Sequence, residues 1–296
     1  MLARRQFLQG MGLAAAALAV AVADAKAPQS KAPALAQRLA AIERGSGGRL
    51  GVTLLDGNGA TLGGQRQDER FPMCSTFKFL LAAAVLQRVD RGELTLQQRV
   101  QIRAADMLSH APVTERHVGG ALSVAELCQA TMIFSDNPAA NLLFPLVGDP
   151  PGLTRFLRGL GDTQTRSDRH EPEMNRYAAG DPRDTTTPAA MAATLRALLL
   201  GDALQPASRK RLTDWMIDNR TGDACLRAGL TPAWKIGDKT GSNGVDTRND
   251  IAIVWPPGRR TPLLLTAYLN GAKVDDAARD AALKAVAVAV RETLAH

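Results

Sequence analysis

The sequence predicts an α/β fold in which both ends of the chain build one antiparallel five-stranded sheet, flanked by helices, with an all-helical part inserted between them. Three observations support this prediction. Short apolar runs bounded by turn residues occur near the beginning, within 49–65, and again near the end, within 234–269. The stretch between them carries mainly helical patterns. With 296 residues, 45% of them hydrophobic, the chain is long enough for one large domain or two smaller ones.

The beginning of the folded part is expected to form a helix and a β-hairpin. The helix covers 33–44, and Gly45 stops it. The two strands cover 49–56 and 60–65. The Gly57-Asn58-Gly59 segment between them is typical of a hairpin turn, so the strands are expected to pair directly.

The middle of the chain is expected to be helical and rich in loops. From Thr76 to Arg91 apolar residues recur at helical spacing, which predicts an amphipathic helix closed by Gly92. Between Ser167 and Thr187 there is no usable periodicity, and a long irregular loop in a compact domain is usually functional or disordered. Further helices are expected at 122–134, 139–146, 153–160, 188–200 and 206–219.

The end of the chain returns to strand patterns. Strands are expected at 234–240, 250–255 and 262–269, and the last two are strongly apolar. A closing helix is expected over 275–294. Together with the hairpin near the beginning, these strands complete the sheet.

Residues 1–27 resemble an export signal that precedes the fold. Arg4-Arg5 stands before an apolar run over 11–23, which is shorter than the ~20 residues of a membrane span. Small residues offer a cleavage site at Ala23-Asp24-Ala25 or at Ala25-Lys26-Ala27. Paired arginines followed by Phe-Leu resemble a twin-arginine signal, which exports folded proteins. We therefore expect a periplasmic protein without a stable membrane anchor; the alternative is an uncleaved anchor.

Charge and cysteine content exclude several classes of function. The net charge is +7, but the longest basic run, Arg209-Lys210-Arg211, has only three residues, so no nucleic-acid partner is expected. The three cysteines, Cys74, Cys128 and Cys225, form no Cys-x-x-Cys pattern, and the four histidines are scattered. We therefore expect no metal site and no cofactor.

The first residues with a chemical pattern are Ser75 and Lys78. On a helix, residues three apart share a face, so the serine hydroxyl and the lysine amine can meet. A serine hydroxyl becomes a good nucleophile when a base takes its proton, and a lysine can be that base if burial lowers its pKa. Free backbone N–H groups at the helix N-terminus near Ser75 suit an oxyanion. Alone, this spacing is a weak signal.

Further motifs follow in a characteristic order: Ser135-Asp136-Asn137, then Glu171 to Asn175 in the irregular loop, then Lys239-Thr240-Gly241-Ser242 at the end of a strand. Ser-x-x-Lys, Ser-Asp-Asn and Lys-Thr-Gly in this order are the signature of class A β-lactamases and their penicillin-binding relatives. The chain after the signal segment thus resembles class A serine β-lactamases over nearly its whole length. It looks closest to chromosomal cephalosporinases exported in folded form.

The resemblance implies a domain organisation. Residues 1–27 would be the signal peptide, 28–67 together with 217–296 the α/β domain, and 68–216 the all-helical domain. The irregular segment 169–184 would be the omega loop of this family, and the active site would lie between the two domains.

The resemblance also implies catalytic roles. Ser75 would be the nucleophile that opens the β-lactam ring, and Glu171 would activate the water that hydrolyses the acyl-enzyme. Lys78 would act as the acylation base or its proton relay, and the choice between Lys78 and Glu171 as the initiating base stays open. Ser135 would pass a proton to the departing lactam nitrogen.

A substrate-binding set is implied as well. Lys239, Thr240 and Ser242, in the motif that includes Gly241, would receive the substrate carboxylate, an anion that needs a fixed cation and hydroxyls. Arg248 would reach in from the neighbouring strand to help bind it. The backbone N–H groups of Ser75 and Ser242 would form the oxyanion hole.

The remaining implied residues lie on loops and helix ends. Asn137 would bind the substrate's side-chain amide and contact Lys78, and Asn175 would help to hold the deacylating water. Arg169 and Asp184 would form an ion pair that closes the base of the omega loop. His110 stands where the family often has an aromatic gate; the other interpretation is an exposed loop histidine.

The sequence departs from the family pattern at two places. The common family disulfide would join Cys128 to a residue that here is Ala82, so that bridge is expected to be absent. Carbapenem-hydrolysing members join the residue before the nucleophile to one just after the Lys-Thr-Gly motif, and here Cys74 would face Asn243. This lowers the expectation of carbapenem hydrolysis, whereas Ser242 resembles members that act on cephalosporins.

The expected function is therefore hydrolysis of penicillins and cephalosporins through a Ser75 acyl-enzyme, which confers antibiotic resistance. The expected ligands are these substrates and mechanism-based inhibitors such as clavulanate, and a monomer suffices. The rival functions are a penicillin-binding DD-peptidase, which usually lacks a glutamate like Glu171, and a β-lactam sensor that stays acylated. A decayed scaffold is disfavoured because the motifs are intact.

Overall fold

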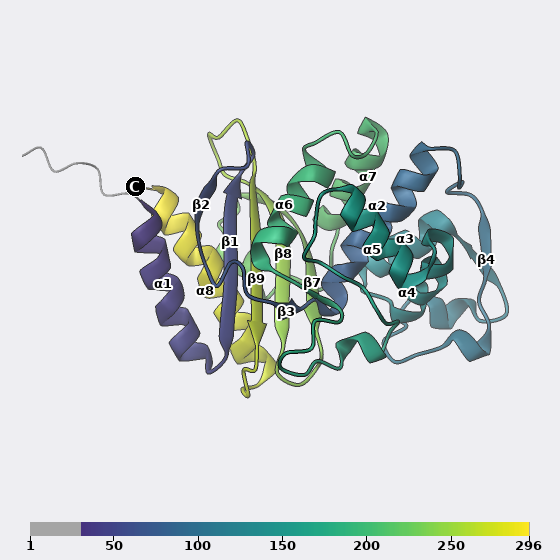
Figure 1. Cartoon of the computed structure of the whole chain (residues 1–296), viewed down its shortest axis with the longest axis horizontal. Helices are drawn as coiled ribbons and strands as arrows, with labels where there is room; N and C mark the ends of the chain where they lie inside the picture. Colours follow the sequence, from purple (N-terminus) through teal and green to yellow (C-terminus); the bar gives the residue numbers. More distant parts are fainter. Residues whose placement is uncertain (1–30, 296) are drawn as a thin grey trace, which may run out of the picture. The chain divides into compact units, whose positions relative to one another are not determined.

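The computed structural model describes residues 31–295, so the predicted twin-arginine signal at 1–27 lies outside the described residues. Its central feature is a five-stranded antiparallel sheet in the order β2-β1-β9-β8-β7 (Figure 1). Two strands come from the beginning of the chain and three from the end, which confirms the predicted fold class. The strands are β1 Arg49–Asp56, β2 Thr61–Gln65, β7 Lys235–Ser242, β8 Arg248–Trp255 and β9 Leu263–Asn270.

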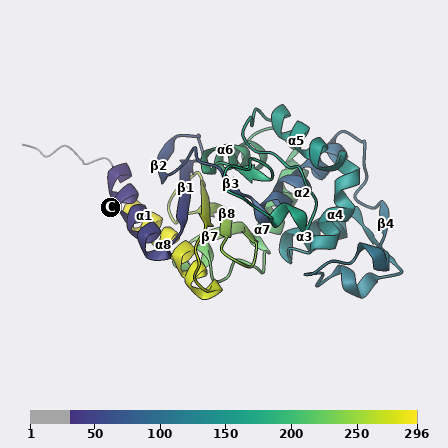
Figure 2. The same ribbon diagram turned by 60° about the horizontal axis from the view of Figure 1, so that its bottom comes forward.

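The helices begin and end within a few residues of their predicted positions. α1 and α8 lie side by side against one face of the sheet in both views (Figures 1 and 2). α6 packs against β1 and β9 from the other face. The α-helices are α1 Lys31–Ser46, α2 Phe77–Asp90, α3 Val124–Ile133, α4 Asn137–Leu143, α5 Asp149–Gly159, α6 Pro188–Leu199, α7 Pro206–Ile217 and α8 Asp276–Ala295.

The sheet separates two hydrophobic cores. On β9, Leu265 and Leu269 belong to the core under α1 and α8, whereas Leu264 and Tyr268 belong to the larger core on the helical side. Successive side chains of a strand point to opposite faces, so alternate residues enter different cores. All of β9 is buried, because both faces of the sheet are covered. This explains why the sequence shows continuous apolar runs here instead of alternation.

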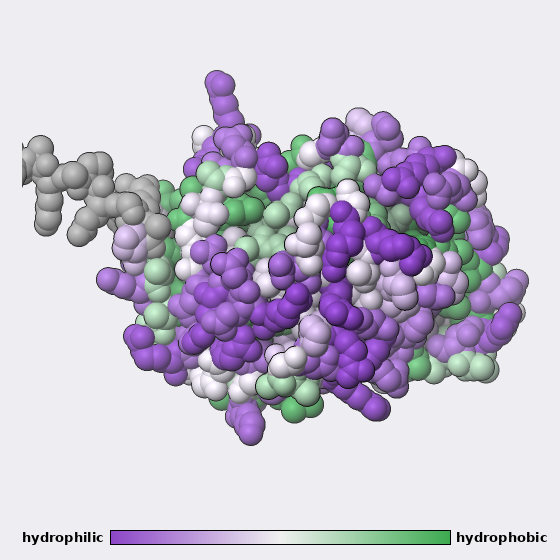
Figure 3. All heavy atoms as spheres, in the orientation of Figure 1, coloured by the Kyte–Doolittle hydropathy of each residue, from purple (hydrophilic) through white to green (hydrophobic). Residues whose placement is uncertain are grey.

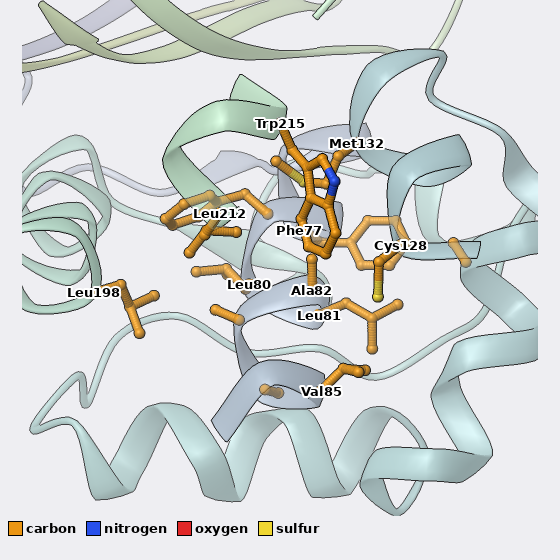
Figure 4. Close-up of a cluster of buried hydrophobic side chains, with 14 of the residues drawn as sticks. Phe77, Leu80, Leu81, Ala82, Val85, Cys128, Met132, Leu198, Leu212 and Trp215 are labelled. Atoms are coloured by element: carbon orange, nitrogen blue, oxygen red, sulfur yellow. The ribbon is translucent and has the colours of Figure 1, made fainter. Parts of the chain in front are cut away.

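The prediction of an amphipathic helix near residue 76 is wrong in one respect. Every side chain of α2 from Phe77 to Leu86 is buried. Figure 4 shows the reason, because side chains from α3, α6 and α7 surround this helix, among them Met132, Leu198 and Trp215. A helix that is apolar all round belongs in a core. The position of Lys78 in this stretch therefore places a lysine inside the protein.

The inserted part also contains two short two-stranded sheets that the sequence analysis did not predict. β4 Arg99–Gln101 pairs with β5 Ala121–Ser123. α3 begins only after β5, because Ser123 and Glu126 form a reciprocal capping box. β3 Phe71–Pro72 pairs with β6 Thr185–Thr186 and so attaches the end of the irregular loop beside the start of α2.

One face of the molecule shows how polar and apolar residues are distributed on its surface. Hydrophilic residues cover most of the face shown in Figure 3, and hydrophobic ones are scattered between them. Within 31–295, no helix combines the length and the apolar character that crossing a membrane requires.

An added methyl group should affect the stability of the protein differently at two glycines, one in a packed strand and one at an open helix end. A Cβ atom at Gly51 would stand 2.4 Å from a ring carbon of Phe71 and 2.8 Å from Pro188 Cγ, so Gly51→Ala overfills the core. We expect it to lower the free energy of unfolding by about 1–3 kcal/mol. Gly159, at the end of α5, has open space for a Cβ atom, so Gly159→Ala should leave stability unchanged or raise it by up to ~1 kcal/mol.

Urea unfolding of the two variants beside the wild type measures both effects. Equal losses of stability in both variants would contradict the packing described for β1.

Candidate active site

Ser75 lies in a 3₁₀ turn, η1 Cys74–Thr76, directly before α2. The turn is tight: Cys74 has a positive φ of 44°, which a residue with a side chain rarely adopts. Strand β7 passes close beside it, since a Cβ atom at Gly241 would stand 2.7 Å from the carbonyl oxygen of Met73 and 3.1 Å from the Ser75 nitrogen. Only glycine at position 241 allows this approach. The backbone N–H groups of η1 and the end of β7 are therefore brought together.

The amine of Lys78 is the centre of the site. Its Nζ donates to Ser75 Oγ at 3.0 Å, to the Ser135 carbonyl oxygen at 2.7 Å and to Asn137 Oδ1 at 2.5 Å. It also lies 3.3 Å from Glu171 Oε1. Lys78 is completely buried. One ammonium group thus joins the start of α2, the start of α4 and the irregular loop.

Burial lowers the pKa of both lysines in the site. Loss of hydration lowers the pKa of Lys78, although the nearby Glu171 carboxylate acts in the opposite direction. Loss of hydration and the positive charge of Lys78 hold the pKa of Lys239 well below its ordinary value. Ser135 Oγ stands between them, 3.4 Å from Lys78 Nζ and 3.1 Å from Lys239 Nζ. A lysine amine whose pKa is lowered can accept a proton closer to neutral pH, as proton transfer from a hydroxyl requires.

Glu171 is held by its backbone and by its side chain. Asn141 Oδ1 accepts the backbone N–H of Glu171 at 3.0 Å, and Asn141 Nδ2 donates to its carbonyl oxygen at 2.9 Å. Asn175 Nδ2 donates to Glu171 Oε2 at 2.5 Å. The sequence analysis missed Asn141. Its spacing of four residues from Asn137 was the available signal, because both then lie on one face of α4.

The irregular loop is closed at its base by a buried carboxylate. Asp184 Oδ2 accepts from Arg169 Nε at 2.6 Å, and Asp184 Oδ1 accepts the backbone N–H groups of Asp168 and Arg169 at 2.7 and 3.0 Å. The backbone N–H of Met73 donates to the Asp184 carbonyl oxygen at 2.9 Å. The two ends of the loop are therefore joined to each other and to the turn before Ser75.

The opposite end of the site is cationic. Lys239 and Thr240 lie at the end of β7, and Thr240 Oγ1 is 2.5 Å from Thr221 Oγ1. Arg248, at the start of β8, donates through Nε to Asp280 Oδ1 at 2.6 Å and through a terminal nitrogen to the Thr221 carbonyl oxygen at 3.2 Å. These contacts aim two cations and a hydroxyl at one region, an arrangement suited to a carboxylate.

The predicted residues come together around one cleft of about 830 Å³. Lys78, Glu171 and Lys239 are buried and contact residues of its wall. Within the described range 31–295, no group of three or more His, Cys, Asp or Glu side chains is placed to hold a metal ion. The predicted residues that line the cleft are Ser75, His110, Ser135, Asn137, Asn175, Thr240, Gly241, Ser242 and Arg248.

Comparison with known proteins assigns this site to a family. Residues 34–294 match the model of the β-lactamase enzyme family. The chain is also 57% identical to a reconstructed ancestral class A β-lactamase of Gram-negative bacteria. The two structures superpose with a TM-score of 0.85, over 87% of this chain and 99% of the other. The chain is a class A serine β-lactamase.

Natural β-lactamases are similar to this β-lactamase as well. It is 79% identical to a β-lactamase from Xanthomonas campestris pv. campestris, with a TM-score of 0.87 over 88% of this chain and 97% of that one. It is 55% identical to β-lactamase L2 of Stenotrophomonas maltophilia over 93% of each protein. A structure of L2 complexed with relebactam matches with a TM-score of 0.85 and 56% identity, covering 90% of this chain and all of that one. The β-lactamase therefore hydrolyses β-lactam antibiotics and confers resistance to them, as its family does.

Two other predictions concern side chains near the cleft. His110 is exposed at the edge of the cleft, has a positive φ of 61° and lies with Nε2 2.9 Å from the Phe134 carbonyl oxygen. Both sequence interpretations of this residue are compatible with that position. The three cysteines of the β-lactamase are buried free thiols. Burial raises the pKa of Cys74 and Cys128, which makes both thiols poor nucleophiles.

The two ion pairs of the irregular loop should differ in their contribution to stability. Arg169→Gln leaves the buried Asp184 carboxylate without its cation, and we expect a loss of about 3 kcal/mol, the lower end for a buried pair because Arg169 is partly exposed. Arg183→Gln breaks a surface pair with Asp181 in the same loop, and the loss of stability should be much smaller. Denaturant unfolding of both variants measures the difference. Similar losses would mean that Asp184 does not hold the loop.

Proposed function

We propose that this β-lactamase opens penicillins and cephalosporins by forming an acyl-enzyme on Ser75, which a water activated by Glu171 then hydrolyses. The supporting observation is the position of the Lys78 amine. It is fully buried and lies 3.0 Å from Ser75 Oγ and 3.3 Å from Glu171 Oε1. One proton-transfer group thus lies beside both the nucleophile and the carboxylate of Glu171.

In the acylation step, the Ser75 proton leaves while Oγ attacks the lactam carbonyl carbon. The proton passes to the Lys78 amine or onward to Glu171, and the distances suit both routes. The backbone N–H groups of Ser75 and Ser242 stabilise the oxyanion, and the close approach of β7 to η1 supports this role. Ser135 Oγ, between the two buried lysines, donates its proton to the lactam nitrogen as the C–N bond breaks and takes a proton from the Lys78 ammonium group in return.

Substrate binding uses the cationic end of the cleft. Lys239, Thr240 and Ser242 receive the carboxylate of the substrate beside Gly241, with Arg248 as a second cation. A fixed anion site of this kind orients the lactam carbonyl toward Ser75.

The acyl side chain of the substrate lies toward the loops. Asn137 binds its amide, Asn175 holds the deacylating water against Glu171, and His110 covers the cleft mouth. Inhibitors that acylate serine, such as clavulanate, bind at Ser75. The relative L2 has been solved in complex with relebactam, and we propose that relebactam binds in the cleft of this β-lactamase as well.

The cellular location and the oligomeric state can be proposed as well. Class A β-lactamases are typically exported to the periplasm. We propose the twin-arginine route for this chain, on the evidence of Arg4-Arg5, and a monomer without a membrane anchor. We also propose that 28–67 with 217–296 and 68–216 are its two domains.

The decisive variant is Glu171→Gln, which removes the proton-accepting carboxylate and keeps the size and shape of the side chain. With a chromogenic cephalosporin, the wild type should turn over many times. The variant should accumulate an adduct on Ser75, visible by intact-mass spectrometry, and its kcat should fall by at least about 10³-fold. Glu173→Gln is the matched control, because Glu173 is an exposed carboxylate two residues away and should keep wild-type kcat.

A wild type that stops after one equivalent and stays acylated would contradict hydrolysis and favour a penicillin-binding enzyme or a sensor. Unchanged turnover in Glu171→Gln would show that another group activates the water.

A further inference from the structure

A row of three rings joins the helix that carries Lys78 to the loop that carries Glu171. Phe77, directly before Lys78, stacks on Phe144 with ring centroids 5.5 Å apart and 6° between the ring planes. The ring of His170, directly before Glu171, meets Phe144 edge-on at 4.9 Å and 82°. Both phenylalanines are completely buried, and Phe77 lies inside the core around α2 (Figure 4). The row thus has a rigid inner end and an outer end on the loop.

α4 and the turn that follows it contact two neighbouring residues of the loop, Glu171 and His170. Asn141 holds both backbone groups of Glu171, and Phe144, three residues later in the 3₁₀ turn η4 Phe144–Val147, receives the ring of His170. The hydrogen bonds from the Asn141 side chain hold the backbone N–H and C=O of Glu171. They do not hold the direction from which the chain enters Glu171, whereas the ring contact at His170 does.

The backbone of His170 also supports the second partner of Glu171. Its carbonyl oxygen accepts the N–H of Met174 at 2.9 Å, which forms the turn leading into η5 Glu173–Asn175. Asn175 in turn donates to Glu171 Oε2 at 2.5 Å. A displacement of His170 would therefore be transmitted to both Glu171 and Asn175.

The imidazole of His170 also lies near a carboxylate. Nε2 lies 3.4 Å from Asp149 Oδ1, at the start of α5, and both side chains are about half exposed. Exposed pairs of this kind contribute little, whereas an aromatic contact on a buried ring has a defined geometry. The contact with Phe144, rather than the pair with Asp149, is the one that can fix the ring.

We propose that His170 is a positioning residue for the deacylation step. Its ring, seated on Phe144 and through it on Phe77, fixes the approach of the loop so that Glu171 and Asn175 keep their distances from the acyl-enzyme on Ser75. The inference rests on the proposed role of Glu171. With Lys78 as the group that takes the Ser75 proton in acylation, its particular consequence is that removal of the ring slows hydrolysis of the acyl-enzyme and leaves formation of the acyl-enzyme intact.

The test separates the rate constants of acylation and deacylation by stopped flow and quenched-flow mass spectrometry with a chromogenic cephalosporin. His170→Ala should lower the deacylation rate constant about tenfold and change the acylation rate constant less than twofold. As a result kcat and KM fall together and kcat/KM is unchanged. His170→Phe keeps the ring and should restore deacylation to within about threefold of wild type.

Three further variants make the test specific. His117→Ala, at an exposed histidine in the 3₁₀ turn η3 Thr114–His117, is the matched control and should keep both rate constants. Asp149→Asn should also keep both. Phe144→Leu removes the other half of the contact, and once it is present, His170→Ala should add less than about threefold to the loss.

The proposal is overturned if His170→Ala lowers the melting temperature but leaves deacylation within twofold of wild type, or lowers both rate constants equally. Additive effects of His170→Ala and Phe144→Leu would overturn it as well, and Phe144→Leu supplies the test should His170→Ala not fold. Glu171→Gln, run in parallel, separates the two claims. If that variant fails to accumulate acyl-enzyme, the proposed function is wrong; if it accumulates and His170→Ala does not slow deacylation, only the present inference is wrong.

Discussion

The site depends on a lysine that has no access to water. Removing an ammonium group from water is costly unless charged and polar partners replace the hydration shell. Lys78 has such partners in the carbonyl oxygen of Ser135, the side chain of Asn137 and the carboxylate of Glu171. Ser135 and Asn137 belong to the start of α4 and Glu171 to the irregular loop, so the lysine on α2 and its partners hold these three parts in one arrangement. The same arrangement places the amine against Ser75.

The rest of the fold supplies the two sides between which this lysine is held. The sheet brings strand β7 against the turn of Ser75, an approach that Gly241 permits and that places Lys239 opposite Lys78 across Ser135. On the other side, the irregular loop is closed by the buried Asp184 and held to α4 by Asn141. Rigid supports of this kind matter because proton transfer and water activation depend on distances of a few tenths of an ångström.

Much of this could be predicted from the sequence, because the signals were local. The strands and helices were recognised from periodicity and turn residues, and the Ser-x-x-Lys, Ser-Asp-Asn and Lys-Thr-Gly motifs identified residues that the structure brings to one cleft. Features that depend on distant contacts were missed. The burial of α2 on all sides requires α3, α6 and α7 around it, and the row from Phe77 to His170 joins residues far apart in the chain. Asn141 had a local signal that was not used.

The central claim is that burial lowers the pKa of Lys78 while its amine contacts both Ser75 and Glu171. The most direct measurement is an NMR titration of enzyme labelled with ¹⁵N at the lysine side-chain nitrogens, with Lys78→Arg used to assign the Lys78 signal. We expect a titration midpoint below the ordinary lysine value of about 10.4. A midpoint at or above that value would contradict it, because the amine would then stay protonated and could not take the serine proton.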